Sequence, residues 1–268
     1  MIQLTNDFVI VVPVWNGEET IIRALDSILS QNYEDLGVII KDDLSDDRTP
    51  EVLMDYFGIR PGGPIRFRFQ GRDILWIRNS VKMYGGGNTY DAVINHTANS
   101  DAIVGVVDGD DHLIRSDAFE KISRVYEEQD KWLVWSQHQR KSGNPGHSSA
   151  LPDDDRIYTN RKYWAVSHFR TCKAWLFRHI RRQDLNDPFL PGSFMKIACD
   201  AALLYPMIEL CGNEKAYFLD EILYQYEDQL PTNEDNFYPE LVARYSDFIR
   251  NQGRTYSRLI LSNYDTLV

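Results

Sequence analysis

The sequence predicts a three-layer α/β domain built on a mostly parallel sheet, followed by a C-terminal helical extension. In the first half of the chain, short apolar runs rich in β-branched residues alternate with amphipathic helical patterns. Aspartate clusters follow two of these runs directly, which is typical of the edge where parallel strands end and ligands bind. We expect the main domain to cover residues 1–230 and the extension to cover residues 231–268.

Strands are expected over residues 8–12, 37–41, 74–77 and 102–107. The longer runs are apolar without alternation, as in strands that helices cover on both faces. Repeated strand–helix–strand units pair their strands in parallel through right-handed crossovers. The carboxyl ends of these strands should therefore meet at one edge.

Helices are expected between the strands. Apolar spacing predicts one over Ile21–Leu29, and Thr49 is expected to cap the next, with Pro50 at its first position. The run Gly85-Gly86-Gly87-Asn88 is expected to form a turn just before a third helix.

The second half is expected to be mainly helical. Helices are predicted over residues 168–182, 198–210 and 237–261, with a kink at Pro206 in the second of them. The polar, glycine- and proline-containing segment 139–156 is expected to be a loop.

The composition is that of a globular protein, with 43% hydrophobic and 26% charged residues. It excludes a disordered or collagen-like chain. The 29 basic and 40 acidic residues give a formal net charge of −11. This excess of negative charge argues against attraction of the protein as a whole to nucleic acid or to an anionic membrane.

The three cysteines, Cys172, Cys199 and Cys211, show no Cys-x-x-Cys spacing, so we expect neither a disulfide framework nor a zinc site. The longest early apolar run, Phe8–Val14, is far shorter than the roughly 20 residues of a transmembrane helix. No basic segment precedes it, so no signal peptide is indicated. A soluble, cytoplasmic protein without a transmembrane segment is expected.

The run Asp108-Gly109-Asp110-Asp111, directly after the strand over 102–107, indicates chemistry most strongly. Clustered carboxylates repel one another, and a hard divalent cation with oxygen ligands relieves this repulsion. Such a cation often bridges to a diphosphate. The alternative is a solvated acidic turn that caps the next helix.

Three motifs in order resemble those of the family 2 glycosyltransferases, whose nucleotide-diphospho-sugar-binding fold is called GT-A. The first is Val12-Pro13-Val14-Trp15-Asn16 with the helical segment Glu18–Gln31 behind it. The second is Asp42-Asp43-Leu44-Ser45-Asp46, and the third is the acidic run Asp108–Asp111. The resemblance covers residues 7–125 and is weaker beyond them.

The resemblance implies a site for a nucleoside-diphosphate sugar donor. Pro13, Trp15, Asn16 and one of Asp42 or Asp43 are expected to form the pocket for base and ribose. An aromatic face can stack on a base, and a carboxylate can accept a base imide N–H. The alternative for Trp15 is simple packing at the sheet edge.

The resemblance also divides the acidic run into roles. Asp110 is expected to be the principal ligand of Mn²⁺ or Mg²⁺. Asp108 is expected to contact the ribose or assist the metal, and Asp111 to contact the ion or the sugar.

Inverting members of the family use a carboxylate base late in the domain, at the start of a helix. Asp200 matches this position best, and Asp187 is the competitor. This chain has Cys199-Asp200 where relatives commonly carry a Glu-Asp pair. An ordinary helix-capping role for Asp200 is compatible with catalysis.

Two departures from the family pattern matter. Gly86 and Asn88 lie in a glycine run that would let donor phosphate or sugar approach a helix N-terminus, although a plain flexible turn explains it equally well. The family's late histidine is absent, so either His168 or Glu227 is expected to replace it.

Cationic residues of the second half are candidates for the leaving diphosphate and for a lid. Arg170, with Lys173 near it, suits a departing diphosphate. Lys141, Arg161 and Lys162 lie on or beside the polar loop and would suit a closing role.

We therefore expect a metal-dependent, inverting transfer of a sugar to a hydroxyl of a glycan, lipid-linked or protein acceptor. The main alternative is a catalytically silent nucleotide- or glycan-binding module. A phosphoryl-transfer hydrolase with an Asp-x-Asp nucleophile is disfavoured, because its motif would follow the first strand. An oxidoreductase is disfavoured because no Gly-x-Gly-x-x-Gly follows that strand.

Overall fold

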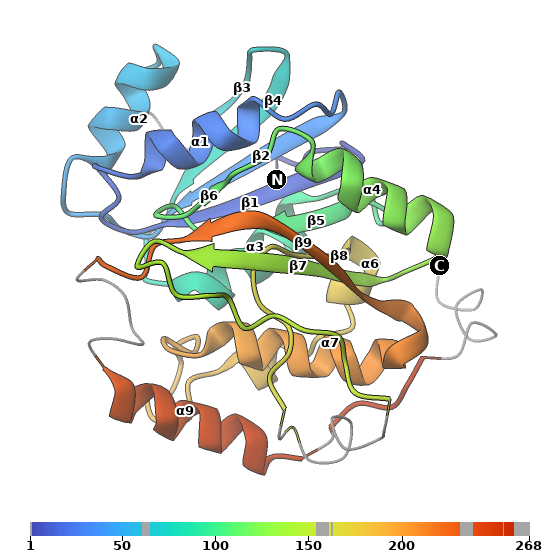
Figure 1. The fold of residues 1–268 in the computed structure, drawn as a ribbon. Coiled ribbons are helices and arrows are strands. Elements are labelled where there is room, and N and C mark those ends of the chain that lie inside the picture. Colours follow the sequence, from blue (N-terminus) through green and yellow to red (C-terminus); the bar gives the residue numbers. More distant parts are fainter. Residues whose placement is uncertain are drawn as a thin grey trace.

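The computed structural model describes residues 2–60, 65–153, 161, 163–230, 238–253 and 255–259 of the 268-residue chain. Its centre is a nine-stranded sheet in the order β3-β4-β2-β1-β5-β8-β7-β9-β6 (Figure 1). The strands are β1 (Phe8–Val14), β2 (Leu36–Asp42), β3 (Ile65–Phe69), β4 (Arg72–Arg78), β5 (Ile103–Val106), β6 (His112–Leu113), β7 (Leu133–Arg140), β8 (Arg170–Lys173) and β9 (Ala216–Tyr226).

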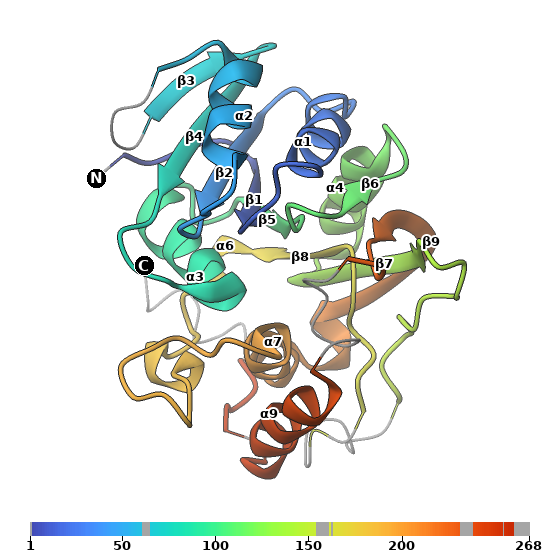
Figure 2. The ribbon, with the colours of Figure 1, turned by 90° about the vertical axis from the view of Figure 1, so that its left-hand side faces the viewer.

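Helices cover both faces of this sheet. They are α1 (Ile21–Leu29), α2 (Thr49–Phe57), α3 (Tyr84–His96), α4 (Ala118–Gln129), α6 (Ala174–Phe177), α7 (Cys199–Lys215) and α9 (Pro239–Asn251), with a 3₁₀ turn over Arg182–Leu185. One face carries α1, α2 and α4, whereas α3, α6 and α7 cover the other, with α9 outside α7 (Figures 1 and 2). The predicted three-layer α/β fold is confirmed.

The pleat of β1 explains why its sequence is apolar throughout. Phe8, Ile10 and Val12 enter the core beneath α1, α2 and α4. Val9 and Val11 enter the opposite core, which α3, α6 and α7 close. Successive side chains of a strand point to opposite faces, so a strand buried on both sides needs an unbroken apolar run.

Parallel pairing brings the strand ends together. β1 pairs in parallel with β2 on one side and with β5 on the other, and β2 pairs in parallel with β4. β8 runs antiparallel between β5 and β7, while β7 and β9 are again parallel. The carboxyl ends of β1, β2 and β5 therefore lie at the same edge of the sheet.

The predicted helix over residues 168–182 is wrong. Residues 170–173 form β8, and only Ala174–Phe177 are helical there. Thr171 and Cys172 pair with both β5 and β7 and are buried. Pairing with two distant strands outweighs the local helical spacing, because burial between two strands depends on tertiary contacts.

Other element predictions need smaller corrections. The glycine run lies inside the first turns of α3 rather than before it, since α3 begins at Tyr84. In α7 the non-helical residue is Gly212, and Pro206 lies within regular helix. α9 spans Pro239–Asn251, and both predicted ends of this helix, Phe237 and the residues after 259, lie outside the described residues.

Two charged pairs lie inside the fold. Arg161 is buried and its guanidinium contacts the Glu209 carboxylate at 2.7 Å, so it is no lid residue. Lys162, the other lid candidate of that segment, lies outside the described residues.

Among the described residues, no helix is long and apolar enough to cross a membrane.

The second buried pair joins β2 to α3. The Lys41 side chain is 2% exposed, and its Nζ contacts Asp91 Oδ2 at 2.6 Å. Burial acts to raise the pKa of Asp91, but hydrogen bonds with His96, Lys41 and Asn95 hold it well below its ordinary value. Asp91 thus compensates a cation that the sheet excludes from water.

We expect Asp91→Asn to lower the free energy of unfolding by about 3 kcal/mol, because it leaves the Lys41 ammonium group buried without a counter-charge. Because the pKa of Asp91 is depressed, this stabilisation is present above about pH 4 and is lost as the pH falls. Urea unfolding measures both effects. Glu120→Gln, which breaks an exposed pair with Arg124, should cost less than about 0.5 kcal/mol. Equal losses in the two variants would contradict the role of Asp91.

Candidate active site

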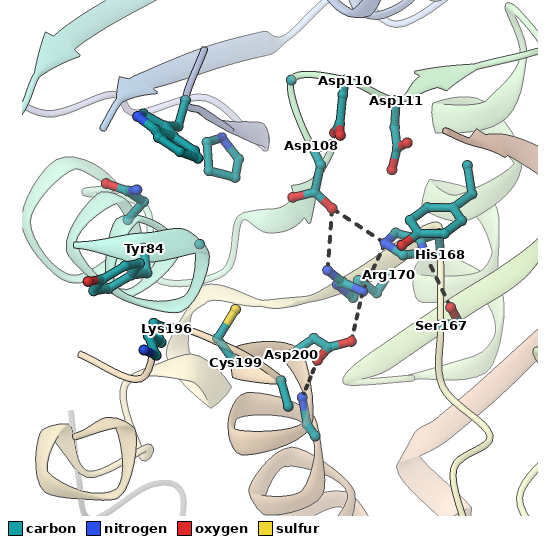
Figure 3. Close-up of a pocket in the computed structure, with 18 of the residues that line it drawn as sticks. Tyr84, Asp108, Asp110, Asp111, Ser167, His168, Arg170, Lys196, Cys199 and Asp200 are labelled. Carbon is teal, nitrogen blue, oxygen red and sulfur yellow. Dashed lines mark hydrogen bonds and ion pairs between the residues drawn. The ribbon is translucent and has the colours of Figure 1, made fainter. Parts of the chain in front are cut away.

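A cavity of about 470 Å³ opens at the edge where β1, β2 and β5 end (Figure 3). Its volume is in the range of small-molecule binding sites. Eleven of the predicted site residues line it, namely Pro13, Trp15, Asn16, Asp43, Asn88, Asp108, Asp110, Asp111, His168, Arg170 and Asp200. Asp42 and Gly86 do not line it.

Close backbone contacts hold the turns of this edge together. The Asp43 N–H donates to Val14 O at 2.8 Å, and the Gly109 N–H donates to Pro13 O at 3.0 Å. A Cβ atom on Gly109 would lie 2.8 Å from Val14 Cβ. A glycine in the acidic run is therefore required for the turn after β5 to reach β1.

The two aspartates after β2 have different surroundings. The Asp43 carboxylate accepts hydrogen bonds from the backbone N–H groups of Met83 and Tyr84, both at 2.8 Å, and so fixes the start of α3. Asp42 is fully buried and accepts from the Ser45 N–H at 2.9 Å. Of the two alternatives for the base pocket, Asp43 lines the cavity, whereas Asp42 supports the turn behind it.

Trp15 forms an exposed wall of the cavity. Its side chain is 48% exposed, so it does not simply pack at the sheet edge. The Lys82 Nζ lies 3.9 Å from the centre of the indole ring. Asn16, at φ 53°, exchanges hydrogen bonds with Asp46 and thereby joins the turn after β1 to the turn after β2.

The glycine run of α3 serves packing between helices. A Cβ atom on Gly86 would lie 2.8 Å from Cys199 Cβ, and one on Gly87 would lie 2.6 Å from the Phe194 ring. Gly86 therefore faces α7 rather than the cavity. Asn88 is buried at the cavity wall, where its Oδ1 accepts from Asn79 Nδ2 at 2.6 Å.

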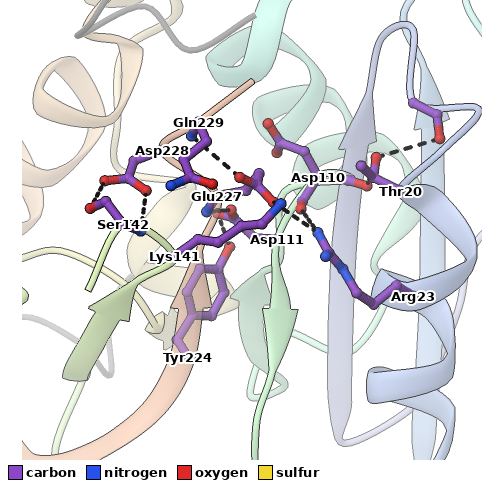
Figure 4. Close-up of polar contacts among 12 residues, drawn as sticks. Thr20, Arg23, Asp110, Asp111, Lys141, Ser142, Tyr224, Glu227, Asp228 and Gln229 are labelled. Carbon is purple, nitrogen blue, oxygen red and sulfur yellow. Dashed lines mark hydrogen bonds and ion pairs between the residues drawn. The ribbon is translucent and has the colours of Figure 1, made fainter. Parts of the chain in front are cut away.

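The members of the acidic run differ sharply in environment (Figure 4). Asp111 is buried, and its two oxygens accept from the Tyr224 hydroxyl and the Glu227 N–H, each at 2.7 Å. Burial, the neighbouring Asp108 and then Glu227 raise the pKa of Asp110 to about 7. The raised pKa indicates negative charge that the surrounding protein does not fully compensate.

A divalent cation fits this edge. Single ligand atoms of Asp108, Asp111 and His168 lie within 4.8 Å of one another. Carboxylate oxygens with an imidazole nitrogen form a donor set that Mn²⁺ accepts, and its charge would compensate the clustered carboxylates. Asp110, the predicted principal ligand, is not in this group but belongs to the same turn.

His168 is held by aromatic stacking. Its ring centre lies 4.8 Å from that of Tyr224 and 5.1 Å from that of Tyr226, with nearly parallel planes. Its Nε2 lies 3.1 Å from Arg170 Nη1, and its Nδ1 lies 3.2 Å from Ser167 Oγ. Burial and the charge of Arg170 lower the pKa of His168, so the ring is neutral.

Arg170 lies between two carboxylates (Figure 3). Its Nη2 is 3.6 Å from Asp108 Oδ2, and its Nη1 is 3.7 Å from Asp200 Oδ2. Asp200 is in the first turn of α7 rather than at the N-cap, which is Ala198. One guanidinium thus spans the distance from the acidic run to the candidate base.

Asp187, the competitor for the base, has a structural role. It is buried, and its carboxylate accepts from the Phe189 and Leu190 N–H groups and from the Tyr245 hydroxyl. It does not line the cavity. Asp200 is the one of the two that a bound substrate can reach.

Glu227 also lies outside the cavity lining. It is buried and accepts from Lys141 Nζ at 2.6 Å and from Arg23 Nη2 at 3.4 Å (Figure 4). Of the two candidates to replace the late histidine, only His168 faces the cavity. Lys141, whose side chain is 45% exposed, pairs with this buried carboxylate.

Several lining residues carry no signal in the sequence. Lys82 comes from the irregular stretch before α3, Tyr84 is the first residue of α3, and Trp164 and Lys196 come from loops of the second half. Cys199 lies beside Asp200 in the first turn of α7 and also lines the cavity. The Pro13–Asn16 and Asp108–Asp111 motifs, by contrast, were recognisable because each directly follows a buried strand.

Comparison with known proteins identifies the family. The model of glycosyl transferase family 2 matches residues 9–184. The chain therefore belongs to glycosyl transferase family 2 and is a glycosyltransferase. A search of curated proteins gave no match.

Solved structures show the same fold at low sequence identity. S. aureus TarS 1–349 in complex with UDP-GlcNAc gives a TM-score of 0.62 at 17% identity, covering 91% of this chain and 65% of that one. Mannosyltransferase PcManGT from Pyrobaculum calidifontis, in complex with GDP-Man and Mn²⁺, gives 0.57 at 14%, covering 86% and 59%. Glucosyl-3-phosphoglycerate synthase from Mycobacterium tuberculosis gives 0.56 at 16%, covering 92% and 80%. This chain spans about two thirds of the TarS fragment, and the predicted GT-A fold is confirmed.

We expect Gly86→Ala to destabilise the protein by about 1–3 kcal/mol, because its new methyl group overlaps the Cys199 Cβ atom. Gly85→Ala is the matched control, since its Cβ would meet only the Cys199 sulfur at 3.3 Å. Urea unfolding of both variants measures the difference. Equal stability of the two would show that α3 and α7 are not in tight contact at Gly86.

Proposed function

We propose that the protein transfers a sugar from a nucleoside-diphosphate sugar to a hydroxyl group of an acceptor, with inversion at the anomeric carbon. The observation that carries this proposal is the position of Arg170, whose guanidinium nitrogens lie 3.6 Å from Asp108 and 3.7 Å from Asp200. The acidic run and the candidate base therefore face one cavity, as a single displacement requires.

The donor nucleotide is assigned to the wall formed by Pro13, Trp15, Asn16 and Asp43. Trp15 is 48% exposed and offers an aromatic surface on which the base can stack, with Lys82 Nζ 3.9 Å from its ring centre. TarS, PcManGT and glucosyl-3-phosphoglycerate synthase have been solved with UDP-GlcNAc, GDP-Man and UDP-glucose, respectively. These complexes support a nucleotide sugar as donor here.

Asp108, Asp110 and His168 are the residues that would hold a divalent metal, Mn²⁺ or Mg²⁺. Asp111 is less available, because both of its oxygens already accept hydrogen bonds. When bound, the metal would neutralise charge on the departing diphosphate. Mn²⁺ in the complexes of PcManGT and glucosyl-3-phosphoglycerate synthase supports this assignment.

Asp200 is assigned as the general base. Its carboxylate is about one third exposed, lines the cavity and lies 3.7 Å from Arg170 Nη1. A base must be ionised and must reach the acceptor hydroxyl on the side of the sugar opposite the diphosphate. A hydroxyl that loses its proton on that side attacks the anomeric carbon opposite the diphosphate, and the configuration at this carbon is inverted.

The acceptor is a hydroxyl of a glycan, lipid-linked or protein molecule. Part of the cavity lining beyond the donor wall comes from Trp164, Tyr226 and Val242, whose apolar surfaces suit the faces of a sugar ring. Cys172, Cys199 and Cys211 form no disulfide in the described structure, which supports a reducing compartment, the cytoplasm.

A thermal-shift panel of UDP, GDP, dTDP and CMP, with and without Mn²⁺, tests the donor site. We expect one nucleoside diphosphate to raise the Tm in a Mn²⁺-dependent manner. Asp110→Asn should keep the fold but weaken this binding by about 100-fold, because it removes a metal ligand. Mn²⁺-dependent binding that survives the substitution unchanged would remove Asp110 from the metal site.

For Asp200→Asn we expect donor binding at saturating Mn²⁺ within about twofold of the wild type and transfer slower by about 10²–10⁴-fold, the usual contribution of a general base. Calorimetry with the nucleotide and a transfer assay measure the two quantities. Asp187→Asn is the control and should lower stability instead, since Asp187 holds a loop. Transfer by Asp200→Asn at the wild-type rate would exclude Asp200 as the base, and retention of the anomeric configuration by ¹H NMR would exclude inversion.

A further inference from the structure

The Arg170 side chain lies within the candidate metal site itself (Figure 3). It is 13% exposed, and its two terminal nitrogens contact Asp108, His168 and Asp200. Two of these three partners, Asp108 and His168, also belong to the group that can hold a metal. The same atoms are therefore available either to the guanidinium or to an ion.

The chemistry of the His168 contact makes this conflict specific. An arginine guanidinium has only donors, so the 3.1 Å contact between Nη1 and His168 Nε2 requires a lone pair on Nε2. The ring proton is then on Nδ1, where it is donated to Ser167 Oγ at 3.2 Å. The 3.4 Å approach of Nε2 to Asp108 is accordingly not an ion pair. A metal bound through His168 needs the lone pair that Arg170 occupies.

We propose that Arg170 is a resident counter-cation that exchanges with the divalent metal. Without metal, the guanidinium compensates Asp108 and binds the lone pair of His168. With metal bound, Arg170 leaves these two groups and is retained by Asp200. This inference rests on the proposed function and makes Arg170 a positioning residue that couples the metal site to the base.

The exchange follows from charge and burial. A carboxylate that is largely removed from water is costly without a counter-charge, and Asp108, whose side chain is 30% exposed, has Arg170 beside it. A divalent ion at the same atoms would repel the guanidinium. Asp200, at 3.7 Å from Nη1, offers the displaced group a second carboxylate without a large movement.

Mn²⁺ binding to the purified full chain, measured by electron paramagnetic resonance of free Mn²⁺, tests the exchange without any turnover. We expect Arg170→Met to bind Mn²⁺ about fivefold or more tightly than the wild type, because the competing cation is gone. Lys196→Met removes another cation of the cavity wall that has no contact with Asp108 or His168 among the described residues. It should change the affinity by less than about twofold. Unchanged or weaker Mn²⁺ binding in Arg170→Met would overturn the proposal.

A double-mutant cycle tests the role of Asp200. Asp200→Asn should weaken Mn²⁺ binding in the wild type, because Arg170 then has no alternative partner. In the Arg170→Met background the same substitution should have little effect. A through-space effect of the lost carboxylate would instead weaken binding equally in both backgrounds, and that result would overturn the retention of Arg170 by Asp200.

Folding and function are checked separately. Thermal unfolding without metal should show a lower Tm for Arg170→Met, and Mn²⁺ should raise it more than in the wild type. Arg170→Lys, which keeps the charge, should have a Tm without metal between those of the wild type and Arg170→Met. Mn²⁺-dependent nucleotide binding in the wild type with equal Mn²⁺ affinity in Arg170→Met would reject the exchange alone. Absence of both Mn²⁺ and nucleotide binding in every variant would reject the proposed function and the exchange with it.

Discussion

The concentration of negative charge after β5 is the constraint on which the site depends. Three carboxylates within four residues lie close together at the end of a buried strand, and one of them, Asp111, is itself buried. The protein relieves this charge in different ways. Asp108 has Arg170 beside it. Asp111 accepts two hydrogen bonds, but burial, Asp110 and Asp108 still raise its pKa well above the ordinary value, and the pKa of Asp110 is raised to about 7. That uncompensated remainder is the most direct structural reason to expect a cation from outside.

The groups that compensate this charge come from distant parts of the chain. Arg170 and His168 come from β8 and the residue pair before it, and Tyr224 comes from β9. Glu227 presents its N–H to Asp111 while Lys141 and Arg23 neutralise its own carboxylate. The antiparallel insertion of β8 between β5 and β7 is what brings this second half against the acidic run. The compensation of charge at the acidic run therefore depends on the strand order of the sheet.

The sequence predicts the first half well because its signals are local. Pro13–Asn16 and Asp108–Asp111 directly follow buried strands, so strand direction alone puts them at one edge. β8 has only four residues, and its pattern of apolar and basic side chains fits a helix equally well until both neighbouring strands are known. The Lys141–Glu227 and Arg23–Glu227 contacts join residues 86 and 204 positions apart, and no local pattern encodes them. Local sequence patterns therefore predict the acidic run but not the groups that compensate its negative charge.

The same distinction applies to the glycine run. A run of three glycines near a helix start suggests an approach to phosphate, yet the space at Gly86 is taken by Cys199 of α7. The absence of side chains lets α3 and α7 approach closely, and the first turn of α7 carries Asp200. Gly86 thus acts on the site through helix packing, because it sets where α7 begins relative to the cavity. Asp43 fixes the start of α3 from the other side through the Met83 and Tyr84 N–H groups, so Asp43 and Asp200 are both positioned by the pair of helices α3 and α7.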